Sequence, residues 1–259
     1  MNEKAKELGL ENSHFESPHG LDSDQHYTTA YELAILTDYA LKNPTFLNLV
    51  GTKNYTVTIN GYPKTLSNTN ELLGNLNGVY GVKTGFTNGA NRCLVTACKR
   101  GNMDLICVVL GADTKSFRTK DSVKLIEYAF NTYQYFDIKD FVSQSILKWQ
   151  NDNPNFFFVE KGTSCNLELK ASASLAKTPV IPVKKDLIPT METNFLVTPF
   201  LQAPINSNDC LGSLKVSSGD TLIAEFDLFS NSFIKKKDVL DYLMDFFKLY
   251  PSQLESSVF

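Results

Sequence analysis

The sequence predicts an α/β fold in which an antiparallel sheet with covering helices is followed by a small all-β sandwich domain and a C-terminal amphipathic helix. Two near-continuous apolar runs, Cys93–Cys98 and Leu105–Leu110, indicate strands that are buried on both faces and therefore covered by helices. From about residue 138, short apolar runs separated by glycine-containing turns indicate the sandwich. We therefore expect three segments, at residues 1–137, 138–235 and 236–259.

Two helices are expected near the N-terminus. Residues 2–8 have a helix-like pattern of charged and small residues that stops at Gly9. Thr29-Ala30-Tyr31-Glu32 matches a capping box, in which the Thr hydroxyl and the Glu carboxylate bind free amides of the first turn. The second helix therefore begins after Thr29, and its apolar face contains Leu33, Leu36 and Ala40.

A hairpin and the central strands follow. Alternating residues Tyr55–Ile59, followed by Asn60-Gly61, predict a hairpin with a tight turn. A further strand is expected over the run that ends at Thr87, and the two apolar runs are joined by the polar turn Lys99–Asp104. A covering helix is expected near residues 117–135, because apolar residues recur there three to four apart, at Val123, Ile126, Phe130 and Tyr133.

In the sandwich, the predicted strands alternate with short turns. The turns contain Lys161-Gly162 and Ser218-Gly219-Asp220. The strands are expected at Phe156–Val159, Cys165–Lys170, Leu214–Val216 and Thr221–Phe226.

Composition excludes several classes of function. A formal net charge of −3 without a long basic stripe argues against nucleic-acid binding, and Lys235–Lys237 is better explained as a solvated helix start. Five dispersed cysteines without a C-x-x-C pair indicate neither a zinc site nor a dense disulfide framework, so no metal or cofactor is expected. Residues 1–10 do not resemble a signal peptide.

The most informative motif is Lys83-Thr84-Gly85, within the run Gly78–Thr87. It is preceded, in order, by Asn12-Ser13-His14-Phe15, Pro18-His19-Gly20-Leu21, Tyr27-Thr28-Thr29-Ala30 and Asn68-Thr69-Asn70-Glu71-Leu72-Leu73. Together these motifs resemble the low-molecular-mass D-alanyl-D-alanine carboxypeptidases, which are penicillin-binding serine peptidases that trim peptidoglycan stem peptides. The resemblance starts at residue 1, in mid-domain, and it extends to the C-terminal β-domain that many of these enzymes carry.

This resemblance implies a β-lactamase/transpeptidase-like sheet and a location in the cell envelope, on the outer face of the cytoplasmic membrane. It implies a stem peptide ending in D-Ala-D-Ala as substrate, and β-lactams as ligands of the intact family. It also assigns roles in the motif. The Lys83 ammonium supports proton transfer and attracts the substrate carboxylate, the Thr84 hydroxyl binds the same carboxylate, and Gly85 allows close approach. The Phe86 amide is an oxyanion-hole donor, and Thr87 completes the substrate-binding set.

The resemblance also implies a role for Arg118, which corresponds to an arginine associated with the terminal carboxylate of the substrate. A guanidinium suits a planar carboxylate because it can form two parallel hydrogen bonds. The alternative is a surface arginine at the start of a helix, and the sequence leaves both open. For Lys83, likewise, the alternative is an ordinary solvent-facing strand lysine.

The two other motifs of the family, S-x-x-K and S-x-N, do not occur ahead of Lys83. Matches occur only after it, at Ser145–Lys148, Ser174–Lys177, Ser232–Lys235 and Ser164-Cys165-Asn166. We expect these to be chance matches outside any suitable buried helix. We therefore expect a chain that is inactive alone, its N-terminal segment lost or encoded separately. The alternative is a non-catalytic remnant or partner-dependent protein that binds peptidoglycan or a membrane.

His14, His19 and His26 lie close together in sequence, which raises the possibility of a metal site. Their spacing matches no zinc motif, so we favour a structural role in the loop. The glycine-rich run is not a Walker A phosphate loop, because Val82 rather than glycine precedes Lys83.

The predicted tail is amphipathic, and peripheral membrane contact is expected through residues 236–250. It contains too many charges to span a bilayer. We favour a helix that lies on the membrane, as relatives have at this end, over one packed on the β-domain. The apolar face contains Val239, Leu240, Leu243, Phe246, Phe247 and Tyr250, and the polar face Asp238, Asp241, Asp245 and Lys248.

Overall fold

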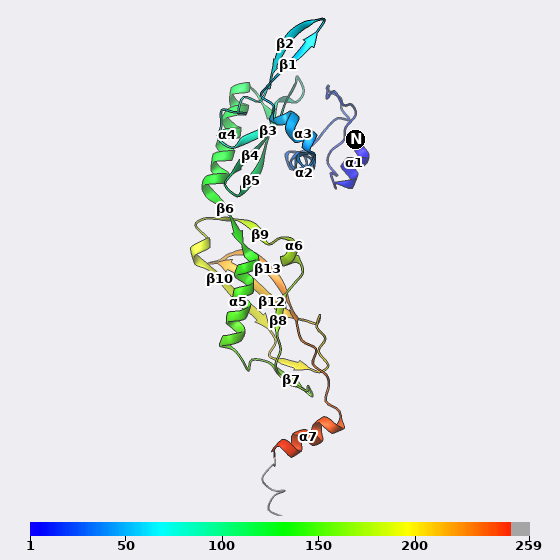
Figure 1. Ribbon diagram of the computed structural model, residues 1–259, viewed down its shortest axis with the longest axis vertical. Coiled ribbons are helices and arrows are strands. Elements are labelled where there is room, and N and C mark those ends of the chain that lie inside the picture. The colour runs from blue at the N-terminus through cyan, green and yellow to red at the C-terminus, as the bar shows by residue number, and fades with distance from the viewer. Residues whose placement is uncertain (250–259) are drawn as a thin grey trace, which may run out of the picture. The chain divides into compact units, whose positions relative to one another are not determined.

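The structure is a computed structural model, and it describes residues 1–249. The chain divides into two compact units, unit 1 over Met1–Tyr133 and unit 2 from Gln134 onward (Figure 1). Tyr250 and the rest of the predicted tail to residue 259 lie outside the described residues. The fold is mixed α/β with several small sheets, in agreement with the predicted class, whereas the three predicted segments and their boundaries stay predictions.

Unit 1 is built around a three-stranded antiparallel sheet in the order β3-β4-β5. Its strands are β3 (Val79–Thr87), β4 (Asn91–Arg100) and β5 (Met103–Ala112). The helices are α1 (Asn2–Glu7), α2 (Ala30–Leu41), α3 (Pro44–Gly51) and α4 (Lys115–Thr132), and a separate hairpin consists of β1 (Asn54–Ile59) and β2 (Tyr62–Ser67).

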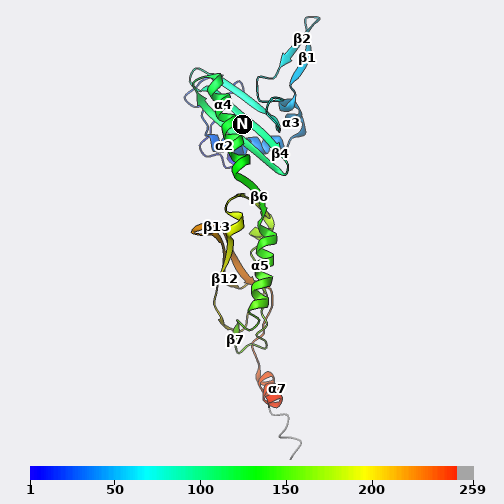
Figure 2. The same cartoon turned by 90° about the vertical axis from the view of Figure 1, so that its left-hand side faces the viewer.

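Helices cover both faces of this sheet, as the two apolar runs predict (Figure 2). On one face, Ile126 of α4 packs with Leu94 and Cys107 of the sheet. On the other face, Val50 of α3 packs with Val82, and the partly buried Leu41 of α2 lies against the same cluster. Alternate residues of each strand therefore enter different cores, and no face of β4 is left to solvent.

Local signals place the helix ends. Gly9 adopts φ +71° after α1, and the Thr29 hydroxyl accepts a hydrogen bond from the Glu32 amide at the start of α2. The second half of the predicted capping box differs, because the Glu32 carboxylate binds Asn12 and Ser13 of the preceding loop. Helix α3, which the sequence analysis omitted, begins at Pro44, and the Asn43 side chain caps it.

Unit 2 contains a four-stranded antiparallel sheet in the order β10-β12-β13-β8. These strands are β8 (Leu169–Ala171), β10 (Met191–Val197), β12 (Cys210–Ser218) and β13 (Thr221–Ser230). Two smaller sheets pair β6 (Tyr133–Asp137) with β9 (Val180–Lys184), and β7 (Phe158–Glu160) with β11 (Phe200–Gln202). The remaining elements are α5 (Ile138–Asp152), α6 (Ser174–Lys177), the 3-10 turn η1 (Ile188–Thr190) and α7 (Val239–Leu249).

The expectation of an all-β segment from residue 138 is wrong over residues 138–152, which form α5. The Asp137 side chain caps this helix by accepting a hydrogen bond from the Asp140 amide at 2.8 Å. Ile138, Val142 and Ile146 recur every four residues and are buried in the core of unit 2. This is the helical period, so the sequence contained the signal for α5.

Candidate active site

The K-T-G triplet lies on β3, which is an edge strand of the three-stranded sheet. Lys83 is exposed, and its Nζ donates a hydrogen bond to the Thr84 carbonyl at 2.8 Å. Phe86 is 52% exposed, and the Arg92 guanidinium lies 3.5 Å from its ring centroid. The predicted site residues from Lys83 to Thr87 therefore lie on an edge strand, where a ligand can pair with the backbone.

Gly85 has little to do with the internal packing of the fold. A Cβ at this position would meet only the Cβ of Cys93, at 3.6 Å, which is an ordinary van der Waals contact. The backbone there does not adopt a positive φ. The fold therefore tolerates a side chain at residue 85, and the space above it is open to a ligand.

A four-residue segment, Asn68–Glu71, fixes the position of β3. The Thr69 and Thr84 hydroxyls are 2.6 Å apart and share a hydrogen bond. Asn70 is 2% exposed, and its Nδ2 donates to the Gly81 carbonyl at 3.0 Å. Asn68 Nδ2 donates to the carbonyls of residues 50 and 52 at the end of α3. Consecutive side chains thus join this segment to two elements, β3 and the end of α3.

Glu71 extends these contacts to α4. Its carboxylate lies 2.5 Å from Lys115 Nζ, accepts a hydrogen bond from the Thr119 hydroxyl at 2.9 Å and lies 3.7 Å from Arg118 Nη2. The Lys115 ammonium, together with Thr119 and the Arg118 charge, holds the pKa of the Glu71 carboxyl below its ordinary value. The carboxylate therefore stays ionised and balances the positive charge at the start of α4.

Arg118 is 3% exposed, which rules out the alternative of a surface arginine. Its Nε and Nη2 atoms are buried and have no hydrogen-bond partner. These two atoms form one side of the guanidinium fork, the side that binds a carboxylate through two parallel bonds. The structure places Arg118 beside Glu71 rather than on the open edge of β3.

The N-terminal loop reaches the far end of β3. Asp22 Oδ2 accepts a hydrogen bond from the Gly89 amide at 3.1 Å. The Thr87 hydroxyl and this amide lower the pKa of the Asp22 carboxyl. Asp22 therefore fixes the turn between β3 and β4 next to Thr87.

Sequence reasoning missed the contributions of Asp22, Thr69, Asn70 and Glu71. Asn68–Leu73 was noted only as part of the family resemblance. The available signal was a run of four polar side chains just ahead of the K-T-G strand, in a position where a loop would be expected. Asp22 gave no sequence signal, because its partner is far away in the chain.

The histidines hold the N-terminal loop. His14 binds the Gln25 carbonyl through Nδ1 at 2.5 Å and Asn2 through Nε2 at 2.9 Å. His19 Nδ1 accepts a hydrogen bond from the Leu21 amide at 3.2 Å, and His26 packs edge-on against Phe15. Over residues 1–249, no group of His, Cys, Asp and Glu side chains is arranged to hold a metal ion.

Two of the three S-x-x-K matches lie in helices, but their lysines, Lys148 and Lys177, are exposed rather than buried as the chemistry requires. Ser145 and Lys148 lie in α5, and Ser174 and Lys177 span α6. However, the Ser145 hydroxyl donates to the Phe141 carbonyl of its own helix at 2.8 Å, and the Ser174 hydroxyl bonds Ser172 at 2.6 Å. Both pairs lie in unit 2, whereas Lys83 lies in unit 1.

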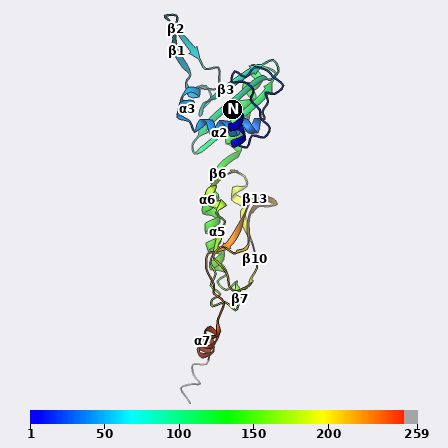
Figure 3. The same ribbon diagram turned by 90° about the vertical axis from the view of Figure 1, so that its right-hand side faces the viewer.

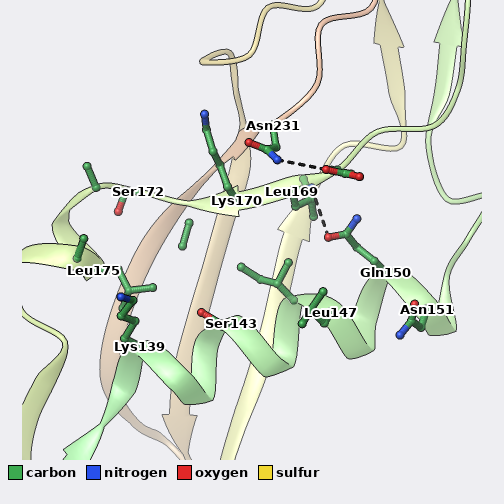
Figure 4. Close-up of a pocket in the computed structure, with 15 residues that line it drawn as sticks. Lys139, Ser143, Leu147, Gln150, Asn151, Leu169, Lys170, Ser172, Leu175 and Asn231 are labelled. Carbon is green, nitrogen blue, oxygen red and sulfur yellow. Dashed lines mark hydrogen bonds between the residues drawn. The ribbon is translucent and has the colours of Figure 1, made fainter.

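A pocket of about 700 Å³ lies in unit 2, between α5, β8 and α6 (Figure 4). Asn231 donates to Glu168 at 3.2 Å and the Leu169 amide donates to Gln150 at 3.4 Å at one end of it. None of the predicted site residues lines this pocket, since it is formed by Lys139, Leu147, Lys170, Leu175 and their neighbours.

Comparisons with known proteins agree with the motif. The family model for D-alanyl-D-alanine carboxypeptidase, peptidase S11, matches residues 1–114. The D-alanyl-D-alanine carboxypeptidase DacF of Bacillus subtilis is 32% identical over 244 residues, which are 94% of this chain and 60% of that protein. DacD of Salmonella typhimurium is 28% identical over 254 residues, 96% of this chain and 60% of that protein.

A solved structure shows the same fold. Penicillin binding protein 5 from Haemophilus influenzae superposes with a TM-score of 0.65 at 23% identity, over 90% of this chain and 64% of that one. The chain thus spans about 60% of the length of the curated relatives named above.

Proposed function

Because this chain belongs to the peptidase S11 family of D-alanyl-D-alanine carboxypeptidases, we propose that it provides the K-T-G part of a serine-type D-Ala-D-Ala carboxypeptidase acting on peptidoglycan stem peptides. One observation carries the proposal. The triplet lies on an accessible edge strand whose position is fixed by the Asn68–Glu71 segment. Held in this way, β3 can bind an extended peptide along its edge without first being ordered.

In this proposal each residue of the triplet has a separate role. The Lys83 ammonium and the Thr84 hydroxyl bind the terminal carboxylate of the substrate, and Lys83 also supports proton transfer. Gly85 leaves room for the peptide backbone, since nothing within the fold fills the space of its missing side chain. The Phe86 amide stabilises the oxyanion that forms when a serine attacks the penultimate D-alanine carbonyl, and Thr87 contacts the same peptide.

Arg118 contributes to carboxylate binding in competition with Glu71. Its unpartnered Nε and Nη2 atoms present the correct fork, and the Glu71 carboxylate lies 3.7 Å from Nη2. A substrate carboxylate that reaches Arg118 therefore has to displace Glu71 from it. Lys115 and Thr119 retain Glu71 when this happens, because they already bind its carboxylate.

Turnover requires a nucleophile and a base from S-x-x-K and a serine from S-x-N, none of which precedes Lys83 in this chain. We therefore propose that the chain by itself binds the peptide end but does not cleave it. The second candidate function, a non-catalytic or partner-dependent binding protein, rests on this same observation. The two differ in whether a polypeptide carrying S-x-x-K and S-x-N restores the release of D-alanine.

Equilibrium binding tests what the two candidate functions share, which is recognition of a peptide that ends in D-Ala-D-Ala. The full chain is titrated with a peptide ending in D-Ala-D-Ala and with the same peptide ending in L-Ala-L-Ala. Lys83→Ala should weaken binding of the first peptide about tenfold, because it removes a charge-assisted hydrogen bond. Lys99→Ala, an exposed lysine on the neighbouring strand, is the matched control. Equal affinity for the two peptides, or an equal effect of both substitutions, would contradict the proposal.

We propose a location at the cell envelope, with α7 lying on the membrane surface. No helix of the described residues is long and apolar enough to cross a membrane. Apolar side chains of α7 are nevertheless exposed, with Val239 at 76%, Leu240 at 71% and Phe246 at 58%. Such a face suits the boundary between headgroups and acyl chains, although Asp241 and Asp245 reduce the attraction to anionic lipid.

Liposome flotation distinguishes membrane contact from packing on unit 2. The full chain is compared with a version that ends at Lys237, which keeps the hydrogen bond from the Lys237 amide to the Lys161 carbonyl. We expect only the full chain to float. If both versions float to the same extent, or neither does, α7 is not the anchor.

A further inference from the structure

The β1–β2 hairpin separates polar from apolar side chains, with Lys64 and Pro63 as the exceptions. Its register pairs Tyr55 with Leu66, Val57 with Lys64 and Ile59 with Tyr62, so these six residues share one face, which we call the apolar hairpin face. The opposite face consists of Asn54, Thr56, Thr58, Pro63, Thr65 and Ser67. This is the pattern of a sheet that packs one face against something apolar.

No third strand or helix of the described residues covers the apolar hairpin face. Tyr62 is 77% exposed, Tyr55 64%, and Ile59 and Leu66 47% each. The hairpin forms a sheet of its own and extends away from the three-stranded sheet of unit 1 in every view (Figure 3). A two-stranded hairpin with an exposed apolar face is marginally stable alone, and such a face is available for binding a ligand.

The hairpin is continuous with the K-T-G site. At its base the Asn68 amide donates to the Lys53 carbonyl at 2.8 Å, and the next residue, Thr69, bonds Thr84 of the triplet. A ligand bound along β3 therefore reaches the base of the hairpin without crossing another element. The arrangement suits one elongated ligand that contacts both places.

Charge defines the ligand further. No Asp or Glu occurs between Asp38 and Glu71, and Lys64 lies in the middle of the apolar hairpin face. The surface is therefore locally basic in a chain whose net charge is −3. It complements a ligand that combines apolar patches with negative charge.

The shape of the face selects among such ligands. The apolar side chains run along six residues of each strand, a length of about 20 Å, and the tip is the polar pair Asn60-Gly61. An insertion into a membrane would need an apolar tip. Two copies stacked face to face would bring Lys64 beside its counterpart, and like charges repel.

We propose that the apolar hairpin face binds the anionic glycan–peptide polymer whose peptide end lies on the K-T-G strand. The Tyr55 and Tyr62 rings lie against the C–H faces of sugar rings, Ile59 and Leu66 extend this apolar contact, and Lys64 pairs with a carboxylate of the polymer. The inference rests on the proposed function for the identity of the polymer. It assigns the hairpin a role in selecting polymeric over short peptide substrates.

The test measures cosedimentation of the full chain with purified, insoluble peptidoglycan. The double substitution Tyr55→Ala and Tyr62→Ala should weaken binding about tenfold or more, since truncation of aromatic contacts is costly. The control, Thr56→Ala with Thr65→Ala, removes the cross-strand hydroxyl contact of 3.0 Å on the other face and should leave binding unchanged. Hydrogen exchange of residues 54–67 verifies that both variants keep the hairpin.

A third variant separates this inference from the proposed function. Lys83→Ala should keep most of the sedimentation while losing affinity for the D-Ala-D-Ala peptide. If sedimentation depends on the tyrosines but the peptide does not bind even to the unmodified chain, the proposed function fails and the hairpin inference stands. If the peptide binds and the tyrosine variant sediments like the unmodified chain, the hairpin inference fails alone.

Related measurements on the same variants distinguish two other ligands of the apolar hairpin face, a membrane and a second copy of the chain. Tyrosine-dependent flotation with phosphatidylglycerol vesicles, without tyrosine-dependent sedimentation, would overturn the inference in favour of a membrane. Tyrosine-dependent dimerisation in sedimentation velocity would overturn it in favour of a second copy. Equal loss of sedimentation in the tyrosine and threonine variants would show that only the hairpin fold matters, which also overturns it.

Discussion

The two units bury different kinds of side chain. The core of unit 2 is a single large apolar cluster, and its buried polar residues among those described are two serines, Ser218 and Ser230. The core of unit 1 is divided by its sheet into two smaller clusters. Unit 1 also buries Glu32, Thr37, Asn70, Thr96, Arg118 and Ser122.

This difference reflects what each unit does. Buried polar groups cost stability unless they are hydrogen-bonded, and the Thr96 hydroxyl and two nitrogens of Arg118 have no hydrogen-bond partner among the described residues. Unit 1 therefore combines divided apolar packing with buried polar groups, one of which, Asn70, holds the K-T-G strand, whereas unit 2 is stabilised by continuous apolar packing. Four experiments test the two units, and they follow in order of decreasing expected effect.

The largest expected effect is the complete absence of acylation by a β-lactam. The chain alone, incubated with benzylpenicillin, should show no mass increase, because no S-x-x-K serine precedes Lys83 and the Ser145 and Ser174 hydroxyls bond elsewhere. Intact-mass measurement provides the readout. A stable adduct on Ser145, Ser174 or Ser232 would show that unit 2 is reactive and would contradict this prediction.

Core truncations should act on one unit at a time. Leu214→Ala in unit 2 and Ile126→Ala in unit 1 each remove a side chain that is 0% exposed, at a cost of about 2–5 kcal/mol. Each should lower one of two thermal transitions and leave the other in place. The exposed Leu222→Ala is the control for unit 2. A single transition that shifts with both substitutions would show that the units unfold together.

Amide hydrogen exchange should also differ between the sheets of the two units. Residues 93–110 belong to a three-stranded sheet with a divided core, and β5 is an edge strand. Their opening free energies should be lower than those of residues 210–230 in unit 2 by about 2 kcal/mol. Strong and equal protection of both stretches would contradict this expectation.

The smallest effect concerns Glu71. Its pKa is lowered in the folded state, chiefly by Lys115, so its contribution to stability is present above the ordinary carboxyl pKa and is lost as the pH falls through the folded pKa. Glu71→Gln should cost about 0.5–1 kcal/mol at pH 7, because solvent screens the pair that the 39% exposed Glu71 side chain forms with Lys115, while the buried Arg118 keeps part of the interaction. The difference should shrink below about pH 4.5.

The matched control is Glu127→Gln. The Glu127 side chain is 39% exposed like that of Glu71, and it pairs with Arg100, which is 23% exposed. Denaturation of both variants across pH measures the two costs. A larger loss for Glu127→Gln would show that the buried arginine does not determine the energetics of this region.

Much of the fold could be predicted from the sequence. The hairpin at Asn60-Gly61, the two buried strands and the covering helix α4 are confirmed. Each depends on a signal contained within a few residues, such as a turn pair with positive φ or an apolar repeat. Helix α5 was not predicted although Ile138, Val142 and Ile146 recur every four residues, because most of the apolar runs after residue 152 are short and strand-like.

The sequence predicts the K-T-G strand, its two partner strands, helix α4 and the resemblance to the carboxypeptidases, but not helix α3, which packs against β3. The tertiary structure shows how that strand is held, through the pairs Asp22–Gly89, Thr69–Thr84 and Glu71–Arg118. It also decided that Arg118 is buried and that the apolar hairpin face is left open. The two kinds of contact differ in their separation along the chain. Caps, turns and periodicity act between neighbours in the sequence, whereas these contacts form only once packing has brought distant residues together.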